Sequence, residues 1–463
     1  MLIRGRGAKR AVVVSMVAVL VASACGRSGS SKTTATTAAG GTATTAAAAS
    51  TAGDFGTLKG VCGPGNATGA TDPGVTNTTI NMATMSDPGY TALPGLNQEL
   101  FDSADAFVGW CNAAGGILGR KIVLHKRDAA LTQVAARMIE SCDAPDFMLA
   151  GNGEALDATG VQQRLSCKLP EIAAYDVSSA AGTAPLSIDP IPVPNSASNL
   201  GGALRAVANF DPSVKSKYGL ISSNQQSIKD SGNRDKAAAQ VLGYTSVSYQ
   251  EAPASVDNYR PYVENLHSAG VQILGIQAQA TQDVGYFKSM ADVGYFPKYV
   301  VLNGNNYDPA MISLGGSVLS SFTGGVLATS SIVPFELASS YPATQLYINL
   351  LNQYAGGAKP KALGVNAMSA WLLWATAAKS CGSNLTRDSV MAKASATTGW
   401  TAGGLHAPQN PGNATVPGSQ CFALLKATPT GWVLDPDVTK PNTGIFNCDP
   451  ANSFKLPGFP QAS

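Results

Sequence analysis

Apolar and polar residues follow two different periods along this chain from residue 77 onward. Short runs of β-branched and apolar residues, typical of buried strands, are separated by longer segments in which apolar residues recur at spacings of three and four. That second spacing is typical of helices with one buried face. The alternation of the two patterns predicts βαβ units on a parallel sheet. We therefore expect an α/β fold.

A first run of these units is predicted before residue 176. We expect strands at 79–84, 121–125, 147–150 and 171–175, separated by helices at 96–111, 131–142 and 156–165. Four prolines follow between residues 184 and 199, and such a stretch suits a crossover between two lobes.

A second run follows the proline-rich stretch. The pattern predicts strands at 218–221, 271–276 and 299–302, with helices between them that include 228–242 and 256–269. Three helical stretches come next, at 338–354, 365–380 and 385–395. The chain then closes with a predicted hairpin of 421–426 and 432–434 around a Pro-Thr-Gly turn.

The first 60 residues have a different composition. Four basic residues precede an apolar run at 11–21, and Ala22, Ser23 and Ala24 lead to Cys25. This is the layout of a secretory signal, and the run is shorter than the roughly 20 residues of a membrane-spanning helix. The segment resembles a bacterial lipoprotein signal, which implies lipid on Cys25. Alternatively, the small residues form an ordinary cleavage site and leave an idle thiol.

Residues 26–57 are almost wholly Ser, Thr, Ala and Gly, too poor in large apolar groups to pack. We expect them to form a tether, so that the exported domain stands on the outer face of the cytoplasmic membrane. The net charge of +2 offers no field for nucleic acid, and the three scattered His residues argue against a metal site. We expect no metal and no cofactor.

The seven cysteines after Cys25 are expected to form disulfides, because an exported protein folds in an oxidising compartment. Cys142 and Cys167 each follow a predicted helix and precede a predicted strand, so neighbouring parallel strands would bring them together. The alternative is that both are buried thiols. We also expect pairs Cys62 with Cys111 and Cys421 with Cys448, which leaves Cys381 unpaired.

The segment that ends the first predicted helix carries a family resemblance. It contains Asn112-Ala113-Ala114-Gly115-Gly116-Ile117-Leu118-Gly119-Arg120. Glycine at a helix C-terminus adopts the left-handed conformation without penalty, and a second glycine permits a tight return into the sheet. The run resembles the signature of type I periplasmic solute-binding proteins of the branched-chain amino-acid (leucine/isoleucine/valine) class, which are lipoproteins that feed ABC importers.

The resemblance implies two doubly wound parallel-sheet lobes joined by three crossovers, with a solute held in the cleft and captured by hinge closure. It also implies a monomer that delivers its solute to ABC permease subunits. By this analogy the chain divides into a signal peptide at 1–24, a lipidated tether at 25–58, an N-terminal arm at 59–72, lobe one at 73–195 plus 326–418, and lobe two at 196–325 plus 419–463.

Ligands of such folds bind at the carboxyl ends of parallel strands, which identifies the candidate loops. Each loop residue is equally compatible with a solvated turn. The candidate solute-binding residues of lobe one are Ser86, Asp87, Tyr90, Asn152, Gly153, Glu154, Tyr175, Asp176, Ser178 and Ser179. Those of lobe two are Asn224, Gln225, Gln277, Gln279, Asn303, Asn305 and Tyr307.

The resemblance implies that hydroxyls and helix N-terminal amides hold the carboxylate of an amino acid, and that an acid holds its ammonium. Ser178 and Ser179 match the hydroxyl-bearing loop, but the position of the acid falls near Asn305. An amide cannot neutralise a buried ammonium. We therefore expect a neutral or amide-like polar solute, unless Glu154, Asp176 or Asp308 replaces the missing acid.

No nucleophile motif, zinc motif or phosphate loop is present, so we expect no enzyme activity. Two other functions stay open from the sequence. The first is that of a lipid-anchored ligand sensor that signals through a partner, and the second is that of a partner-binding surface lipoprotein without a transport role.

Overall fold

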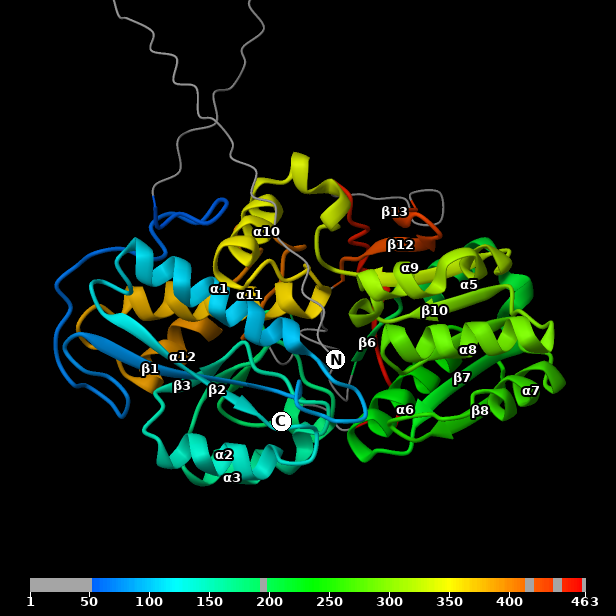
Figure 1. The fold of residues 1–463 in the computed structure, drawn as a ribbon, viewed down its shortest axis with the longest axis horizontal. Helices are drawn as coiled ribbons and strands as arrows, with labels where there is room; N and C mark the ends of the chain where they lie inside the picture. Colours follow the sequence, from blue (N-terminus) through cyan, green and yellow to red (C-terminus); the bar gives the residue numbers. More distant parts are fainter. Residues whose placement is uncertain (1–51, 192–197, 413–419, 436–443, 460–463) are drawn as a thin grey trace, which may run out of the picture. The chain divides into compact units, whose positions relative to one another are not determined.

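The computed structural model describes residues 52–191, 198–412, 420–435 and 444–459. All of them belong to one unit, Ser50–Ser463. The expected signal peptide, Cys25 and most of the tether lie outside the described residues. The described helices and strands divide between two sheets, which we call the first and the second sheet (Figure 1). Elements packed on each sheet form the first and the second lobe.

The first sheet has five parallel strands in the order β2-β1-β3-β4-β5. Its interior strand β1, between β2 and β3, buries residues on both faces, because alternate side chains of a strand point in opposite directions. Ile80 and Met82 contact one apolar cluster, whereas Ala83 and Met85 contact another. The strands are β1 (Thr79–Ser86), β2 (Lys121–Asp128), β3 (Met148–Ala150), β4 (Glu171–Ile172) and β5 (Ser187–Ile188).

Helices cover both faces of this sheet, so it is doubly wound. The first face packs on α1 (Gln98–Ala114) and on α11 (Ala362–Ser380), which is buried along nearly its whole length. The second face packs on α2 (Val134–Asp143), next to α3 (Val161–Ser166). Two further helices, α10 (Pro342–Tyr354) and α12 (Arg387–Ser395), pack on α1 and α11 respectively.

The second sheet has the order β13-β12-β11-β10-β9-β7-β8 and is parallel from β11 to β8. Its last two strands by sequence, β12 and β13, form an antiparallel hairpin on the edge of β11. The strands are β7 (Tyr218–Ser223), β8 (Ser246–Ala252), β9 (Ile273–Ile276), β10 (Tyr299–Leu302), β11 (Gly325–Ser330), β12 (Ala423–Thr428) and β13 (Gly431–Leu434).

Both faces of the second sheet are also covered. On one face lie α7 (Arg260–Ser268), α8 (Ala280–Val293) and α9 (Pro309–Gly315). On the other lie α5 (Gly202–Phe210) and α6 (Gln226–Val241). A separate two-stranded pair joins β6 (Ser198–Leu200) to β14 (Ser453–Lys455) beside α5. The expected α/β architecture with two doubly wound lobes is confirmed.

The chain passes between the two sheets after Ile188, after Ser330 and after Ser395. These passages correspond to the three expected crossovers. The expected boundary at residue 326 lies inside β11, which pairs with β10 and β12. We therefore propose that the return to the first lobe begins after Ser330, and the remaining lobe boundaries stay a prediction.

The glycine-rich turn after α1 is built from left-handed residues. Gly115 ends the helix with φ of 119°, and its neighbour Gly116 has φ of 78°. The buried guanidinium of Arg120 then donates to the backbone oxygen of Gly69 in the N-terminal arm at 3.1 Å and to that of Thr76, before β1, at 3.0 Å. The turn thus fixes both the entry into β2 and the position of the arm.

The three disulfides join the cysteine pairs that the sequence analysis expected. Cys62 bonds to Cys111 and ties the arm to α1, whereas Cys142 bonds to Cys167 between α2 and the segment before β4. The third joins Cys421 to Cys448, and among the described cysteines Cys381 forms no disulfide.

Some elements differ from the sequence-based expectations. The expected strand 171–175 ends at Ile172, because Ala174 already donates its backbone N–H to Asn152 outside the ladder. The helix expected at 156–165 is divided into a 3₁₀ turn, Asp157–Thr159, and α3. The sequence patterns did not identify β5, β6, β8, β11, β14, α5 or α9. None of the helices in the described ranges is long and apolar enough to span a membrane.

We predict that Gly116→Ala destabilises the fold far more than Gly356→Ala. Both glycines have positive φ, which costs an alanine about 1 kcal/mol. At Gly116 the new Cβ would also lie 2.1 Å from the backbone oxygen of Arg120, which adds about 2 kcal/mol of overpacking. At Gly356 it would meet no atom within 4 Å. Urea unfolding measures both variants, and equal losses would contradict the role assigned to the turn.

Candidate functional site

A cavity of about 360 Å³ lies at the carboxyl ends of the strands of both sheets. Its lining comes from the loops after β1, β2, β3 and β4 in the first lobe and from the ends of β7, β9 and β10 in the second. Residues from the crossovers, including Ile191 and Ser331, complete it. Its volume is within the range of about 300–1,000 Å³ that is usual for small-molecule sites.

The first-lobe wall of the cavity is mainly apolar. Its aliphatic members include Leu93, Leu96, Leu131 and Leu363, and the rings of Tyr90 and Tyr175 also line it. The Tyr175 hydroxyl accepts a hydrogen bond from the Nδ2 of the buried Asn97 at 2.6 Å. This wall therefore offers contact area more than hydrogen bonds.

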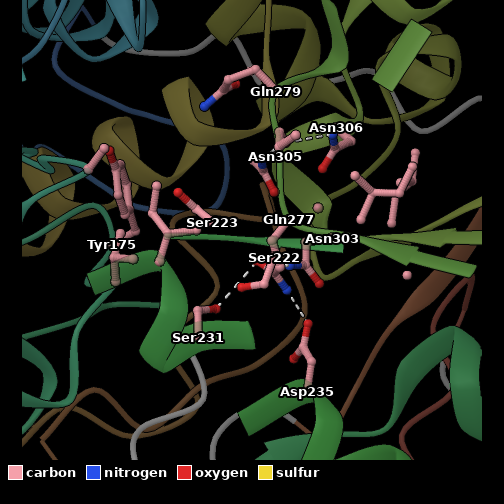
Figure 2. A pocket seen from close by; sticks show the side chains of 18 of the residues that line it. Tyr175, Ser222, Ser223, Ser231, Asp235, Gln277, Gln279, Asn303, Asn305 and Asn306 are labelled. Atoms are coloured by element: carbon pink, nitrogen blue, oxygen red, sulfur yellow. Dashed lines mark hydrogen bonds between the residues drawn. The ribbon is translucent and has the colours of Figure 1, made fainter. Parts of the chain in front are cut away.

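The second-lobe wall contains aliphatic residues such as Ile221 and Leu302 and a group of polar side chains organised around Gln277, which follows β9. Its Nε2 donates to the Asp235 carboxylate, and its Oε1 accepts from Asn303 Nδ2 at 3.2 Å and from Ser231 Oγ at 3.5 Å (Figure 2). Among the described residues, none donates a hydrogen bond to the side-chain oxygens of Asn303 and Asn305. These amide oxygens are acceptors that a solute can use.

Arg234 of α6 is the cation among the described residues that line the cavity. It is 3% exposed and reaches the first lobe, where it donates to the Val177 backbone oxygen at 2.7 Å and to Ser179 Oγ at 3.3 Å. Burial lowers the pKa of Arg234, whereas nearby acids, first Asp235, oppose that change. The side chain thus bridges the two lobes beside the cavity.

Two buried carboxylates accept hydrogen bonds from backbone N–H groups of the first-lobe loops. Asp87, after β1, accepts from Leu131 N and Ala155 N, each at 2.8 Å. Asp157, after β3, accepts from Val177 N at 2.6 Å and from Ser178 N at 3.1 Å. Burial raises the pKa of both acids, and these amide hydrogen bonds oppose the rise. Together the two side chains tie four loops to one another.

Further acids lie close to this wall, and one of them, Asp176, lines the cavity. Burial raises the pKa of Glu154 well above its usual range, and repulsion from Glu171 adds to the rise. The pKa of Asp176 is likewise raised well above its usual range by burial and by repulsion from Asp189. Burial raises the pKa of Asp189 itself to about 7. The folded state of this region therefore holds protons more tightly than the unfolded chain does.

Part of the set of solute-binding residues predicted from the sequence lines the cavity. The lining members are Tyr90, Tyr175, Asp176, Gln277, Gln279, Asn303 and Asn305. The others lie outside the lining, namely Ser86, Asp87, Asn152, Gly153, Glu154, Ser178, Ser179, Asn224, Gln225 and Tyr307. The carboxyl-end rule identified the edge of each sheet at which this cavity lies but did not establish which side chains face the cavity.

In the first lobe, the residues outside the lining hold loops together. Ser86 Oγ donates to the Asn97 backbone oxygen at 2.8 Å, and Asn152 Nδ2 donates to Glu171 at 3.0 Å. A Cβ on Gly153 would lie 2.4 Å from the Tyr175 ring, so this glycine makes room for a cavity residue. The buried Ser178 caps the short helix α4 (Ser179–Gly182) through its Oγ.

In the second lobe, the residues outside the lining are of two kinds. Asn224 is exposed and accepts a hydrogen bond from Gln225 at 3.3 Å, so these two form a turn before α6. Tyr307 is buried, its ring stacks on Phe335, and its hydroxyl donates to Glu336. Asp308, named as a substitute acid, forms an ion pair of 3.0 Å with Lys361 and does not line the cavity.

Several lining residues were missed by the sequence analysis. Ser231 and Asp235 are four residues apart on α6, so they share one face of a helix that begins at the carboxyl end of β7. That periodicity was a usable signal. The leucines of the first lobe gave none, because apolar loop residues are more often part of the core. The other polar residues missed include Arg234 and Asn366.

A model of the periplasmic binding protein family matches residues 84–431, most of the described chain. The chain belongs to this family. Periplasmic binding proteins are exported and bind small solutes without transforming them, so this chain is a binding protein and not an enzyme. A comparison with curated protein sequences found no match.

Solved structures with the same fold include ABC transporter solute-binding proteins. A fatty acid ABC transporter substrate-binding protein from Thermomonospora curvata is 15% identical, with a TM-score of 0.65 over 79% of this chain and 93% of its own. A possible leucine/isoleucine/valine-binding protein from Rhodopirellula baltica is 14% identical, with a TM-score of 0.61 over 79% and 98%. At these identities the likeness establishes the fold alone.

A third similar structure is an R. palustris solute-binding protein in complex with 4-hydroxybenzoate. It is 16% identical, with a TM-score of 0.61 over 77% of this chain and 95% of its own.

The raised pKa of Asp189 predicts a pH-dependent stability. Between about pH 4 and pH 7 the folded protein keeps a proton that the unfolded chain releases, so stability falls as pH rises through this window. Asp189→Asn should remove much of this fall and raise the free energy of unfolding at pH 8 by on the order of 2 kcal/mol. Urea unfolding at pH 5 and pH 8 measures the free energy of unfolding of the wild type and the variant. The control is Asp292→Asn, at an exposed residue of α8. If the free energy of unfolding of Asp189→Asn depended on pH as it does in the wild type, Asp189 would not be the group responsible.

Proposed function

We propose that this protein is the extracytoplasmic solute-binding component of an ABC importer. It captures one small solute in the cavity by hinge closure of its two lobes and presents the closed form to permease subunits. The observation that carries this proposal is the shared cavity, to which both sheets contribute the carboxyl ends of their strands. A site divided between two lobes couples binding to closure, because the solute gains contacts with both walls only when they approach.

The solute carries an uncharged hydrogen-bonding group rather than the two charges of an α-amino acid. Gln277, Asn303 and Asn305 supply amide donors and acceptors to the cavity. Asn305 stands where the resemblance implied an acid, and an amide does not neutralise an ammonium. The loop expected to hold a carboxylate is the one whose amides already bond to Asp157.

Lipid anchoring is part of the same proposal and rests on sequence alone. The signal peptide covers 1–24, Cys25 carries the lipid, and the Ser/Thr/Ala/Gly stretch to residue 58 tethers the binding domain to the membrane. A monomeric binding domain on a tether can reach a permease in the same membrane without any transmembrane helix of its own.

A solute library tests the binding function. The library contains amino acids, amides, ureas, small organic acids and aromatic compounds, and the readout is the thermal unfolding midpoint of the purified protein. A solute present at 100 times its Kd should stabilise the folded state by about 2.7 kcal/mol. We expect an amide or another neutral solute to raise the midpoint. No shift with any member would contradict a solute-binding role.

A cysteine substitution tests the anchor. In cells that express the protein, Cys25→Ser should move it from the membrane fraction to the soluble extracytoplasmic fraction, because lipid on this sulfur is the proposed attachment. The matched control is Cys381→Ser, which removes a thiol that forms no disulfide and should leave the protein on the membrane. Cell fractionation and labelled fatty-acid incorporation measure both. Retention of Cys25→Ser on the membrane would exclude this anchor.

A further inference from the structure

The cavity gathers its leucines and its amides in different places. The first lobe contributes four leucines and two tyrosine rings, with Asn97, Asp176 and Asn366 as polar members, whereas the second contributes the amides and hydroxyls that surround Gln277 (Figure 2), next to aliphatic residues such as Ile221 and Leu302. A solute that satisfies both walls has one apolar end and one hydrogen-bonding end. A compact, fully polar solute would leave the leucine wall in contact with water, and the binding site would gain no hydrophobic contribution from it.

Four backbone N–H groups of the first-lobe loops already donate to carboxylates of the protein, so they are not available to an anionic solute. Leu131 N and Ala155 N bond to Asp87, and Val177 N and Ser178 N bond to Asp157. A solute carboxylate at this wall would have to displace an internal carboxylate, which would then be buried without its hydrogen bonds. The carboxylates of Asp87 and Asp157 would also repel a solute carboxylate.

The second-lobe wall does not supply a net positive charge either. Arg234 lies close to Asp235, Asp157 and Asp176, and it donates to the Val177 backbone oxygen. Its charge is thus compensated by protein groups. Asp235 in turn accepts from Gln277 and from Asn199 Nδ2 at 3.4 Å, so an ammonium would have to replace these amide donors.

We propose that the solute is a neutral amphiphile. Its apolar body packs on the Leu93, Leu131 and Leu363 wall, and its amide, urea or hydroxyl head bonds to Gln277, Asn303 and Asn305. This inference rests on the proposed solute-binding function and goes beyond it by naming the class and the orientation of the solute. Gln277 is the residue that sets head-group specificity, because it is the centre of the polar network and is held in place by Asp235.

Matched probes that share one body and differ in the head test the inference. Isocaproamide, isocaproate and the corresponding amine form one series, and hydrocinnamamide, hydrocinnamate and its amine form the other. Isothermal titration calorimetry with the purified protein measures each Kd, with L-leucine included. We expect the better-fitting amide to bind at least tenfold more tightly than its carboxylate and its amine, and more tightly than L-leucine.

The outcomes separate this inference from the proposed function. Equal or tighter binding of a carboxylate, an amine or L-leucine overturns the neutral amphiphile and leaves solute binding intact. Binding of another library solute, but of neither amide, also overturns it. A failure of every member of the solute library and of both series contradicts the solute-binding function itself.

Two substitutions localise the ends of the solute. Gln277→Ala should weaken amide binding about tenfold and reduce the preference for the amide head, whereas Gln272→Ala, at the exposed residue just before the start of β9, should leave both unchanged. Leu363→Gln should weaken both series through the body, with Leu314→Gln of α9 as its exposed control. Thermal unfolding without solute shows that each variant folds.

Asn303→Ala serves as the second head variant if Gln277→Ala fails to fold. Wild-type affinity in both Leu363→Gln and the head variant that folds would overturn the assigned orientation.

Discussion

The arrangement of the cavity depends on two buried carboxylates that bond to backbone amides. Asp87 joins the loops after β1, β2 and β3, and Asp157 joins the loops after β3 and β4. A buried carboxylate is costly unless it is hydrogen-bonded, so each acid needs the amides as much as the loops need the acid. The residues that donate, Leu131, Ala155 and Val177, also line the cavity. Their apolar side chains form its first wall because their backbones are held in this way.

The second lobe completes the site with a network of polar side chains. Its polar side chains come from the ends of three neighbouring strands and from α6, and Gln277 connects them through Asp235 and Asn303. Arg234 extends from the same helix to the backbone of the first lobe and bonds the residue that Asp157 also holds, Val177. The loop that carries Val177 is thus stabilised from both lobes, which links the position of one wall to that of the other.

Much of the fold followed from local patterns in the sequence. Strands and helices with strong periodicity were predicted within a few residues, and the glycine-rich turn after α1 and the three disulfides were found where their positions suggested. Some of the elements that were missed are short and depend on partners distant in the chain, as β6 depends on β14, whereas β8 and β11 are longer strands that were also missed. A three-residue strand lacks a periodic pattern, so no local signal identifies it.

The site was less predictable than the fold, and two residues show why. Asp87 and Gln277 both follow buried strands, and the carboxyl-end rule selected both. In the structure Asp87 bonds to loops of its own lobe, whereas Gln277 lines the cavity. The difference lies in which backbone amides come within reach after folding, which no spacing in the sequence encodes.

A crystal structure with the tightest-binding solute tests the central claim most directly. The account predicts a solute whose polar head lies within hydrogen-bond distance of Gln277 and whose body contacts Leu131 and Leu363, while Asp157 still accepts from Val177 N and Ser178 N. A solute carboxylate bonded to those two amides, with Asp157 displaced, would contradict it.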